Sequence, residues 1–248
     1  MMWFFTGLTI LALATVALAR WARIGLGWQP VIALVRATAQ LALIATLLSG
    51  VLAAPWTVVL FVALMLSTAS WTAGGRLVEL RHGRRIAATG VLTGAAVALV
   101  PVFALQLVAL DIRQVIAIAG IVIGNAMAGA TLTGRMFHQT AAQRSSEVEG
   151  WLALGARPSQ AHAEIGQAAT RETLLPSLDQ TRSTGLVTLP GAFVGALFGG
   201  ADPITAAQFQ LMVLAAIALA KLTTSIVVTR MAGRSPFIVP TTAHGERA

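Results

Sequence analysis

The residues Glu149-Gly-Trp-Leu-Ala-Leu-Gly155-Ala-Arg-Pro158 lie at the centre of a polar segment that extends from Arg135 to Arg182. This segment contains five arginines and five of the nine acidic residues of the chain. Apolar runs long enough to cross a bilayer flank it on both sides. The contrast predicts a membrane protein that displays one large polar segment outside the lipid.

The composition supports the same class of protein. Of 248 residues, 56% are hydrophobic and only 10% are charged, with a mean hydropathy of +0.79, whereas soluble domains carry about 25% charged residues. We therefore expect an all-α integral membrane protein. The net charge of +8 is no indication of nucleic-acid binding, because the basic residues lie between apolar runs, as topology determinants do. The chain has no cysteine, which excludes disulfides and thiolate metal sites.

The apolar runs predict about seven transmembrane helices in one membrane domain. Residues 1–134 hold the first five, residues 135–182 form a helical cytoplasmic loop, residues 183–230 hold the last two, and residues 231–248 form a basic cytoplasmic tail. The sixth run, about 185–199, is interrupted by Leu189-Pro190-Gly191. All arginines between the spans except Arg113 fall on one side, which predicts an external N-terminus and a cytoplasmic C-terminus.

Within the polar segment the pattern predicts a helical elbow. We expect a helix to leave the fifth span and to stop near Gly155, since glycine adopts the left-handed conformation readily. Pro158 suits the first turn of a second helix, which we expect to end at Leu175-Pro176. Two interpretations stay open: the elbow receives force from an ATPase, or it only packs against its own protein. The residues proposed for ATPase contact are Glu149, Trp151, Gly155, Arg157 and Pro158.

Polar residues inside apolar runs are expensive and are therefore candidates for a translocation path. For Arg36 and Lys221, extension of the side chain to the membrane surface is the alternative. For Asn125, a hydrogen bond between helices packed closely at Gly124 is favoured. Pro190 is the best single pointer, because a helix break frees backbone groups that need protein or water around them. The full set of path candidates is Arg36, Gln40, Gln106, Asn125, Pro190, Gln210 and Lys221.

Several motifs resemble those of known permeases. Glu149 and Gly155 have the spacing of the Glu-Ala-Ala-x-x-x-Gly loop of ABC-transporter permeases, although Trp151 replaces the second alanine. A wider resemblance, from about 118 to 230, is to the FetB-type iron-export permeases, which are related to plant aluminium-tolerance permease subunits. It rests on Gly124-Asn125-Ala-Met127, Glu147-Val-Glu149, Leu152-Ala-Leu-Gly155-Ala, Gln160-Ala161, Thr188-Leu-Pro190-Gly191, Gly200-Ala-Asp202-Pro203 and Gln208-Phe-Gln210.

The resemblance implies a multi-pass permease of the bacterial inner membrane that exports iron or another metal. It also implies two copies of this chain and a separate ATP-binding subunit that carries ATP–Mg. The chain itself has no Walker A sequence, so we expect neither enzyme activity nor a cofactor in it. The spans hold no histidine, no cysteine and no clear carboxylate, the ligands that iron prefers. An anionic or chelated cargo, or a secondary transporter without an ATPase, therefore remains an alternative.

Overall fold

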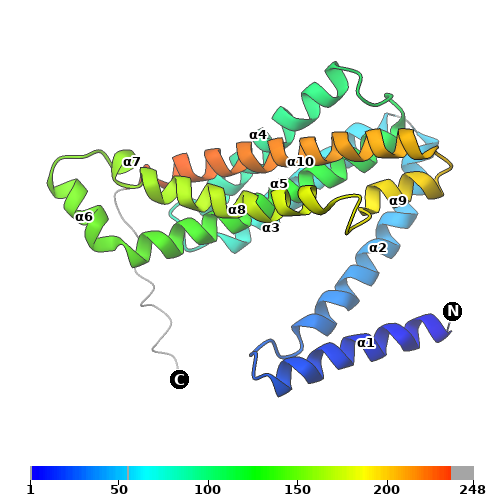
Figure 1. The fold of residues 1–248 in the computed structure, drawn as a ribbon, viewed down its shortest axis with the longest axis horizontal. Helices are drawn as coiled ribbons and strands as arrows, with labels where there is room; N and C mark the ends of the chain where they lie inside the picture. Colours follow the sequence, from blue (N-terminus) through cyan, green and yellow to red (C-terminus); the bar gives the residue numbers. More distant parts are fainter. Residues whose placement is uncertain (1, 55, 236–248) are drawn as a thin grey trace. The chain divides into compact units, whose positions relative to one another are not determined.

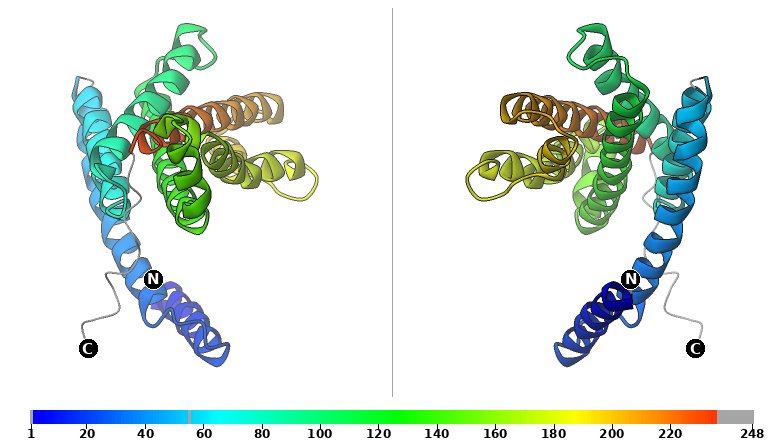
Figure 2. Two further views of the ribbon diagram at one scale, coloured as in Figure 1. Left: turned by 90° about the vertical axis from the view of Figure 1, so that its left-hand side faces the viewer. Right: turned by 90° about the vertical axis from the view of Figure 1, so that its right-hand side faces the viewer.

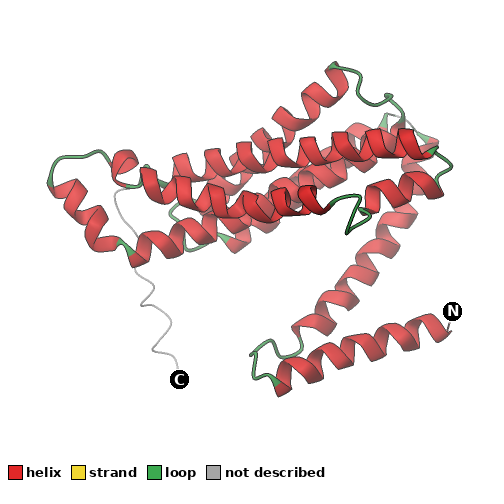
Figure 3. Cartoon of the chain, viewed as in Figure 1, coloured by secondary structure: helices red, strands yellow, loops and turns green. Residues whose placement is uncertain are grey.

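The computed structural model describes residues 2–54 and 56–235, and within them the regular elements are helices, with one isolated bridge between Thr184 and Thr188 (Figure 3). In chain order the helices are α1 (Met2–Trp21), α2 (Gln29–Ala53), α3 (Thr57–Arg76), α4 (Gly83–Ala104), α5 (Ile112–Gln143), α6 (Ser145–Ala153), α7 (Pro158–Ala161), α8 (Ala163–Ser183), α9 (Gly191–Phe198) and α10 (Pro203–Ala232) (Figure 1).

Among the described residues, six helices are long and apolar enough to cross a membrane: α1, α2, α3, α4, α5 and α10. This confirms the all-α membrane fold. The run predicted as a sixth span differs from the others, because α9 has only eight residues and is about 12 Å long. It begins at Gly191, so the predicted break at Pro190 is confirmed, and residues 184–190 before it form no helix.

The chain divides into two compact units, residues 1–57 and residues 58–248. In the first unit α1 packs against α2. Most of its large apolar side chains are exposed, for example Trp3 at 92%, Leu11 at 68% and Leu41 at 67%. Apolar surface of this extent is what a lipid-facing helix presents.

In the second unit α4, α5 and α10 pack closely through small residues. A Cβ atom added to Gly94 of α4 would lie 1.9 Å from Thr224 Oγ1 and 2.8 Å from the Ala220 carbonyl oxygen. Glycine is therefore required for the close approach of α4 to α10. The core of buried alanine and branched residues continues along this contact and includes Ala87, Val91, Ala98, Ile118, Val122, Ala126, Ala220 and Val228.

Helix α8 turns back and runs along α5 and α10 (Figures 1 and 2). The buried Thr133 hydroxyl of α5 lies 2.9 Å from that of Thr173 and 2.7 Å from that of Ser225. Lys221 Nζ donates to Ser177 Oγ over 2.6 Å. The prediction that the helix ends at Leu175-Pro176 is wrong, because Pro176 lies inside α8. Contacts on both sides of the proline, at Thr173 and Ser177, hold the helix in place.

The ends of the long helices also differ from the predicted bounds. The fourth helix ends at Ala104, well before the expected end near Leu110. Helix α5 continues to Gln143 and breaks at Arg144 before α6, so the expected helix out of the fifth span is in two pieces. Helix α10 extends to Ala232, and residues 236–248 of the predicted basic tail lie outside the described residues.

Candidate functional site

The elbow is closed at Gly155. Its φ of +88° lies in the region that favours glycine. The Gly155 amide donates to the Leu152 carbonyl oxygen over 3.0 Å, and the Ala156 amide donates to that of Trp151 over 3.0 Å. These two bonds form a Schellman motif, which satisfies the last carbonyls of α6. The predicted glycine stop is therefore confirmed.

A second helix begins directly after this turn. Pro158 is its first residue, where a missing N–H costs nothing. Arg157 precedes it with extended backbone, and its amide donates to Gln160 Oε1 over 2.9 Å. This short helix, α7, ends at Ala161, and α8 follows after His162. The predicted helix start at Pro158 is confirmed, and Arg157 fixes that start through its backbone.

The tip of the elbow shows an apolar and acidic surface. Trp151 is 53% exposed and Leu154 is 83% exposed. Glu149 is also exposed, and no ion pair of its carboxylate is found within residues 56–235. Val148 points inward and is buried at 2% exposure, which anchors α6 to the rest of the unit. The elbow thus has a fixed inner side and a free outer side.

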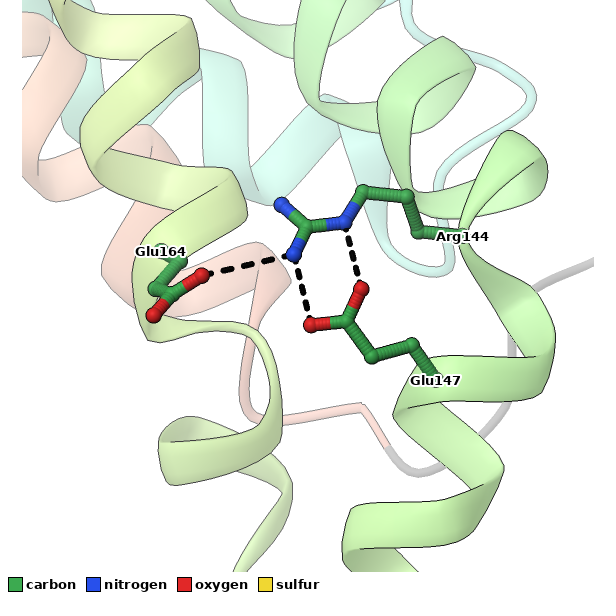
Figure 4. A network of polar contacts seen from close by, with 3 residues as sticks. All are labelled: Arg144, Glu147 and Glu164. Atoms are coloured by element: carbon green, nitrogen blue, oxygen red, sulfur yellow. Dashed lines mark hydrogen bonds and ion pairs between the residues drawn. The ribbon is translucent and has the colours of Figure 1, made fainter.

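One arginine joins the two arms of the elbow (Figure 4). Arg144 Nε lies 2.7 Å from Glu147 Oε2, and its Nη2 lies 2.5 Å from Glu147 Oε1 and 3.3 Å from Glu164 Oε2. Glu147 belongs to α6 and Glu164 to the first turn of α8. Hydrogen bonds to Glu147 and then to Glu164 raise the pKa of Arg144. The fork to Glu147 and the single contact to Glu164 therefore link the start of α6 to the start of α8 at the protein surface.

Two of the proposed path residues meet at the start of α9. Pro190 is the residue before the helix and has extended backbone. Gln210 of α10 is buried, and its Oε1 accepts the Phe193 amide over 3.1 Å. The first amides of a helix lack partners within it, so Gln210 caps α9 from a neighbouring helix. The structure therefore gives Gln210 a structural task at the break.

The break is a short loop that is held by hydrogen bonds between its own backbone groups. The Gly185 amide donates to the Thr188 carbonyl oxygen over 2.9 Å, and the Thr188 amide donates to that of Ser183 over 3.2 Å. Leu186 is 95% exposed and Val187 is 81% exposed. Non-helical backbone beside α10, a membrane-length helix, needs protein or water around it.

Gln106 and Asn125, two further path candidates, have surroundings that differ from the predicted ones. Gln106 was expected inside a span, but it follows the end of α4 in an exposed turn with φ of +51°. Asn125 Nδ2 donates to the Ile121 carbonyl oxygen of its own helix over 2.9 Å. A Cβ on Gly124 would meet nothing within 4 Å, so the expected close packing at Gly124 is wrong. Arg36 and Gln40 are exposed residues of α2, in the first unit.

Lys221 is the path candidate with the most informative surroundings. It is half-buried, its stem packs on Gly129, and its ammonium reaches Ser177 of α8. The Thr133, Thr173 and Ser225 hydroxyls lie on the same three helices. Sequence reasoning missed this hydroxyl cluster, because threonine and serine are ordinary residues in membrane helices and only the return of α8 brings them together. Among the described residues, no group of three or more His, Cys, Asp or Glu side chains is placed to hold a metal ion.

The sequence matches the model of the uncharacterised protein family UPF0014 over residues 2–237. It is 33% identical to the UPF0014 membrane protein STAR2 of Oryza sativa over 224 residues, 89% of this chain and 78% of the relative. It is 34% identical to the protein ALUMINUM SENSITIVE 3 of Arabidopsis thaliana over 157 residues, 63% of this chain and 58% of the relative.

A third relative is the probable iron export permease protein FetB of Escherichia coli, which is 39% identical over 100 residues, 40% of this chain and 39% of the relative. No solved structure matches the chain. These matches confirm the resemblance to the FetB-type family. The chain belongs to the UPF0014 family of membrane proteins.

Proposed function

We propose that this chain is the membrane subunit of an ABC transporter that exports iron or another metal. A separate ATP-binding subunit docks on the elbow formed by α6, Gly155 and α7. The observation that carries this proposal is the elbow surface: Trp151 and Leu154 are exposed on a turn whose inner side is fixed. Metal export is supported by the name of one relative, the probable iron export permease FetB.

The helical break supports a path for cargo beside α8. Helix α10 is about 45 Å long, which matches a bilayer with its headgroups. Gly166 packs on Thr229 near one end of α10, while Ser177 contacts Lys221 about 12 Å deeper. The last turns of α8 therefore lie at the depth of the hydrocarbon, although Asp179 and Arg182 are exposed there and pair over 3.2 Å.

An exposed ion pair at this depth needs water or protein rather than lipid. A second copy of the chain, facing the first across a water-filled space, satisfies this requirement for both copies at once. The proposed transporter therefore contains two permease subunits and two ATP-binding subunits. The exposed end of α8 and the break at residues 184–190 line the space between the permeases.

An anionic or chelated metal is the second candidate cargo. The observation that favours it is Lys221, a cation in the apolar part of α10 whose contact in the described structure is a hydroxyl. A bare metal ion would be repelled by this ammonium group, whereas a negatively charged chelate would be attracted. The two cargoes can be separated in a transport assay.

The docking proposal is tested by purifying the tagged chain from its host and measuring the ATPase activity that accompanies it. Leu154→Glu places a charge at the tip of the elbow without disturbing a packed side chain. Loss of a hot-spot contact at the centre of a protein interface costs about 2 kcal/mol or more. With Leu154 in that role in the proposed interface, we expect the associated ATPase activity to fall about thirtyfold.

Leu110→Glu is the matched control, because Leu110 is 78% exposed and precedes α5, whereas the elbow follows its end. If both variants retain the ATPase equally, the elbow is not the docking surface.

Uptake of free iron and of a negatively charged iron chelate into inverted vesicles, measured in parallel with ATP, identifies the cargo class.

A further inference from the structure

A groove of about 950 Å³ lies between α8 and the last turns of α10. The two helices run in opposite directions along it. Ser177 lies against Lys221, and eleven positions earlier Gly166 lies against Thr229. The order of the residues that line the groove can therefore be read along both helices, from the depth of the membrane to its surface.

The deep end of the groove is apolar. It is lined by Leu174, Leu175 and Leu178 of α8 and by Leu222 and Ile226 of α10. Helix α10 carries no charge from Pro203 to Ala220, and its next charged residue after Lys221 is Arg230. The hydrocarbon boundary therefore falls between residues 221 and 230 of α10, and this end of the groove lies at the depth of the acyl chains.

The outer end of the groove is cationic. Arg230 of α10 and Arg234 just after α10 line it. Arg171 of α8 follows towards the apolar end at about the level of Ile226, and all three arginines are exposed. No acidic residue lines the groove. None of the three makes an ion pair within the described residues, in contrast to Arg144 and Arg182, which bind carboxylates of their own chain. Three like charges in one groove repel one another unless an anion lies between them.

We propose that this groove binds an anionic phospholipid of the surrounding leaflet. The acyl chains lie against the five apolar side chains, and the phosphate lies among Arg171, Arg230 and Arg234. Arginine suits this role because its planar guanidinium binds phosphate oxygens through two parallel hydrogen bonds. Basic pockets between transmembrane helices bind such headgroups elsewhere. Neither the apolar end alone nor the arginines alone would select a phospholipid. The apolar residues at the depth of the acyl chains, followed by arginines nearer the membrane surface, match the two parts of such a lipid.

The bound lipid would hold α8 against α10 on the side that the Thr133, Thr173 and Ser225 hydroxyls do not reach. Binding of this lipid does not depend on the cargo or on an ATP-binding partner. It therefore stands or falls separately from the proposed transport function.

The test uses the full chain in a mild detergent, with phosphatidylglycerol and phosphatidylcholine of identical acyl chains added in separate titrations. Bound lipids are counted by native mass spectrometry. We expect a saturable phosphatidylglycerol site that phosphatidylcholine does not fill. Each single substitution Arg171→Gln, Arg230→Gln or Arg234→Gln should weaken it about fivefold, and the triple substitution about a hundredfold. The triple Arg→Lys variant keeps the charges but loses the paired hydrogen bonds to phosphate, so it should recover only part of the affinity.

The control variant is Arg76→Gln, Arg81→Gln and Arg85→Gln, which removes the same charge from exposed positions outside the groove. At 150 mM salt it should change the affinity by less than about twofold, because none of these three arginines lines the groove and exposed charges are screened by salt. Equal losses in the groove and control variants would overturn the proposal by showing a non-specific attraction. Full competition by inorganic phosphate would overturn it as well, since the site would then recognise a free anion.

Discussion

Replacing Gly155 by alanine tests whether the elbow depends on its left-handed turn. A Cβ at Gly155 meets nothing within 4 Å, so the substitution creates no clash and acts only through the φ of +88°. Holding an L-residue in this conformation costs roughly 1–2 kcal/mol. Gly150 is the matched control: it lies in the middle of α6, and its Cβ also meets nothing within 4 Å. There alanine gains up to about 1 kcal/mol of helix propensity.

The two variants should therefore have opposite effects on the stability of the elbow. Opening of the turn releases the amides of Gly155 and Ala156, which hydrogen exchange detects. In Gly155→Ala a cost of roughly 1–2 kcal/mol corresponds to about 5- to 30-fold faster exchange, whereas Gly150→Ala should exchange more slowly than the unmodified chain. Peptides covering residues 150–162, analysed by mass spectrometry, supply the measurement. Equal exchange in both variants would refute the assignment of the elbow to this turn.

Substitutions at Gly94, Gln210 and Asp202 test the membrane unit, each measured by reversible unfolding in mixed micelles. Gly94→Ala should lower the free energy of unfolding by about 1–3 kcal/mol through overpacking, while Gly124→Ala, where the Cβ meets open space, should not destabilise the protein. Gln210→Leu leaves the Phe193 amide without its acceptor and should cost about 1–3 kcal/mol. Asp202 caps α10, and the hydrogen bond from Thr205 lowers the pKa of the Asp202 carboxyl below the usual 3.8. The stabilisation by this carboxylate is present above that value and is lost as the pH falls through the folded pKa. Asp202→Asn should therefore remove this acid dependence.

The sequence was sufficient to predict the elbow because each of its parts is local. Gly155 stops a helix and Pro158 starts one through the conformations of their own backbones. Neither effect depends on a distant residue. The break at Pro190 is local as well, because the proline fixes its own backbone conformation and α9 begins at the next residue.

The return of α8 could not be predicted in the same way. Its polar composition resembles that of a surface loop, and Pro176 is a common sign of a helix end. What extends the helix is a set of partners far along the chain: Thr133 binds Thr173, and Lys221 binds Ser177. A pattern of apolar residues gives no information about hydrogen bonds between helices, because threonine and serine occur on both buried and exposed faces.

The same limit explains the errors at Gly124 and Gln106. A spacing of small residues shows which helix face can pack closely, but not whether another helix lies there. The close approach occurs instead at Gly94 of α4, where Thr224 of α10 fills the space. Gln106 was placed inside a span because the apolar run continued past Pro101, and the helix nevertheless ends at Ala104.

Helix α8 joins the two features from which the function was inferred. It begins at Ala163, separated from α7 at the elbow by His162 alone, and it ends at Ser183, where the broken segment starts. Its 21 residues form a rod about 32 Å long, and the contacts of Gly166, Thr173 and Ser177 join it to α5 and α10 along its length. If an ATP-binding subunit pulls on Trp151 and Leu154, the displacement therefore reaches the exposed end of α8 and the loop at residues 184–190 without unfolding of the intervening chain. A permease that works in this way needs no moving part between the docking surface and the path other than this one helix.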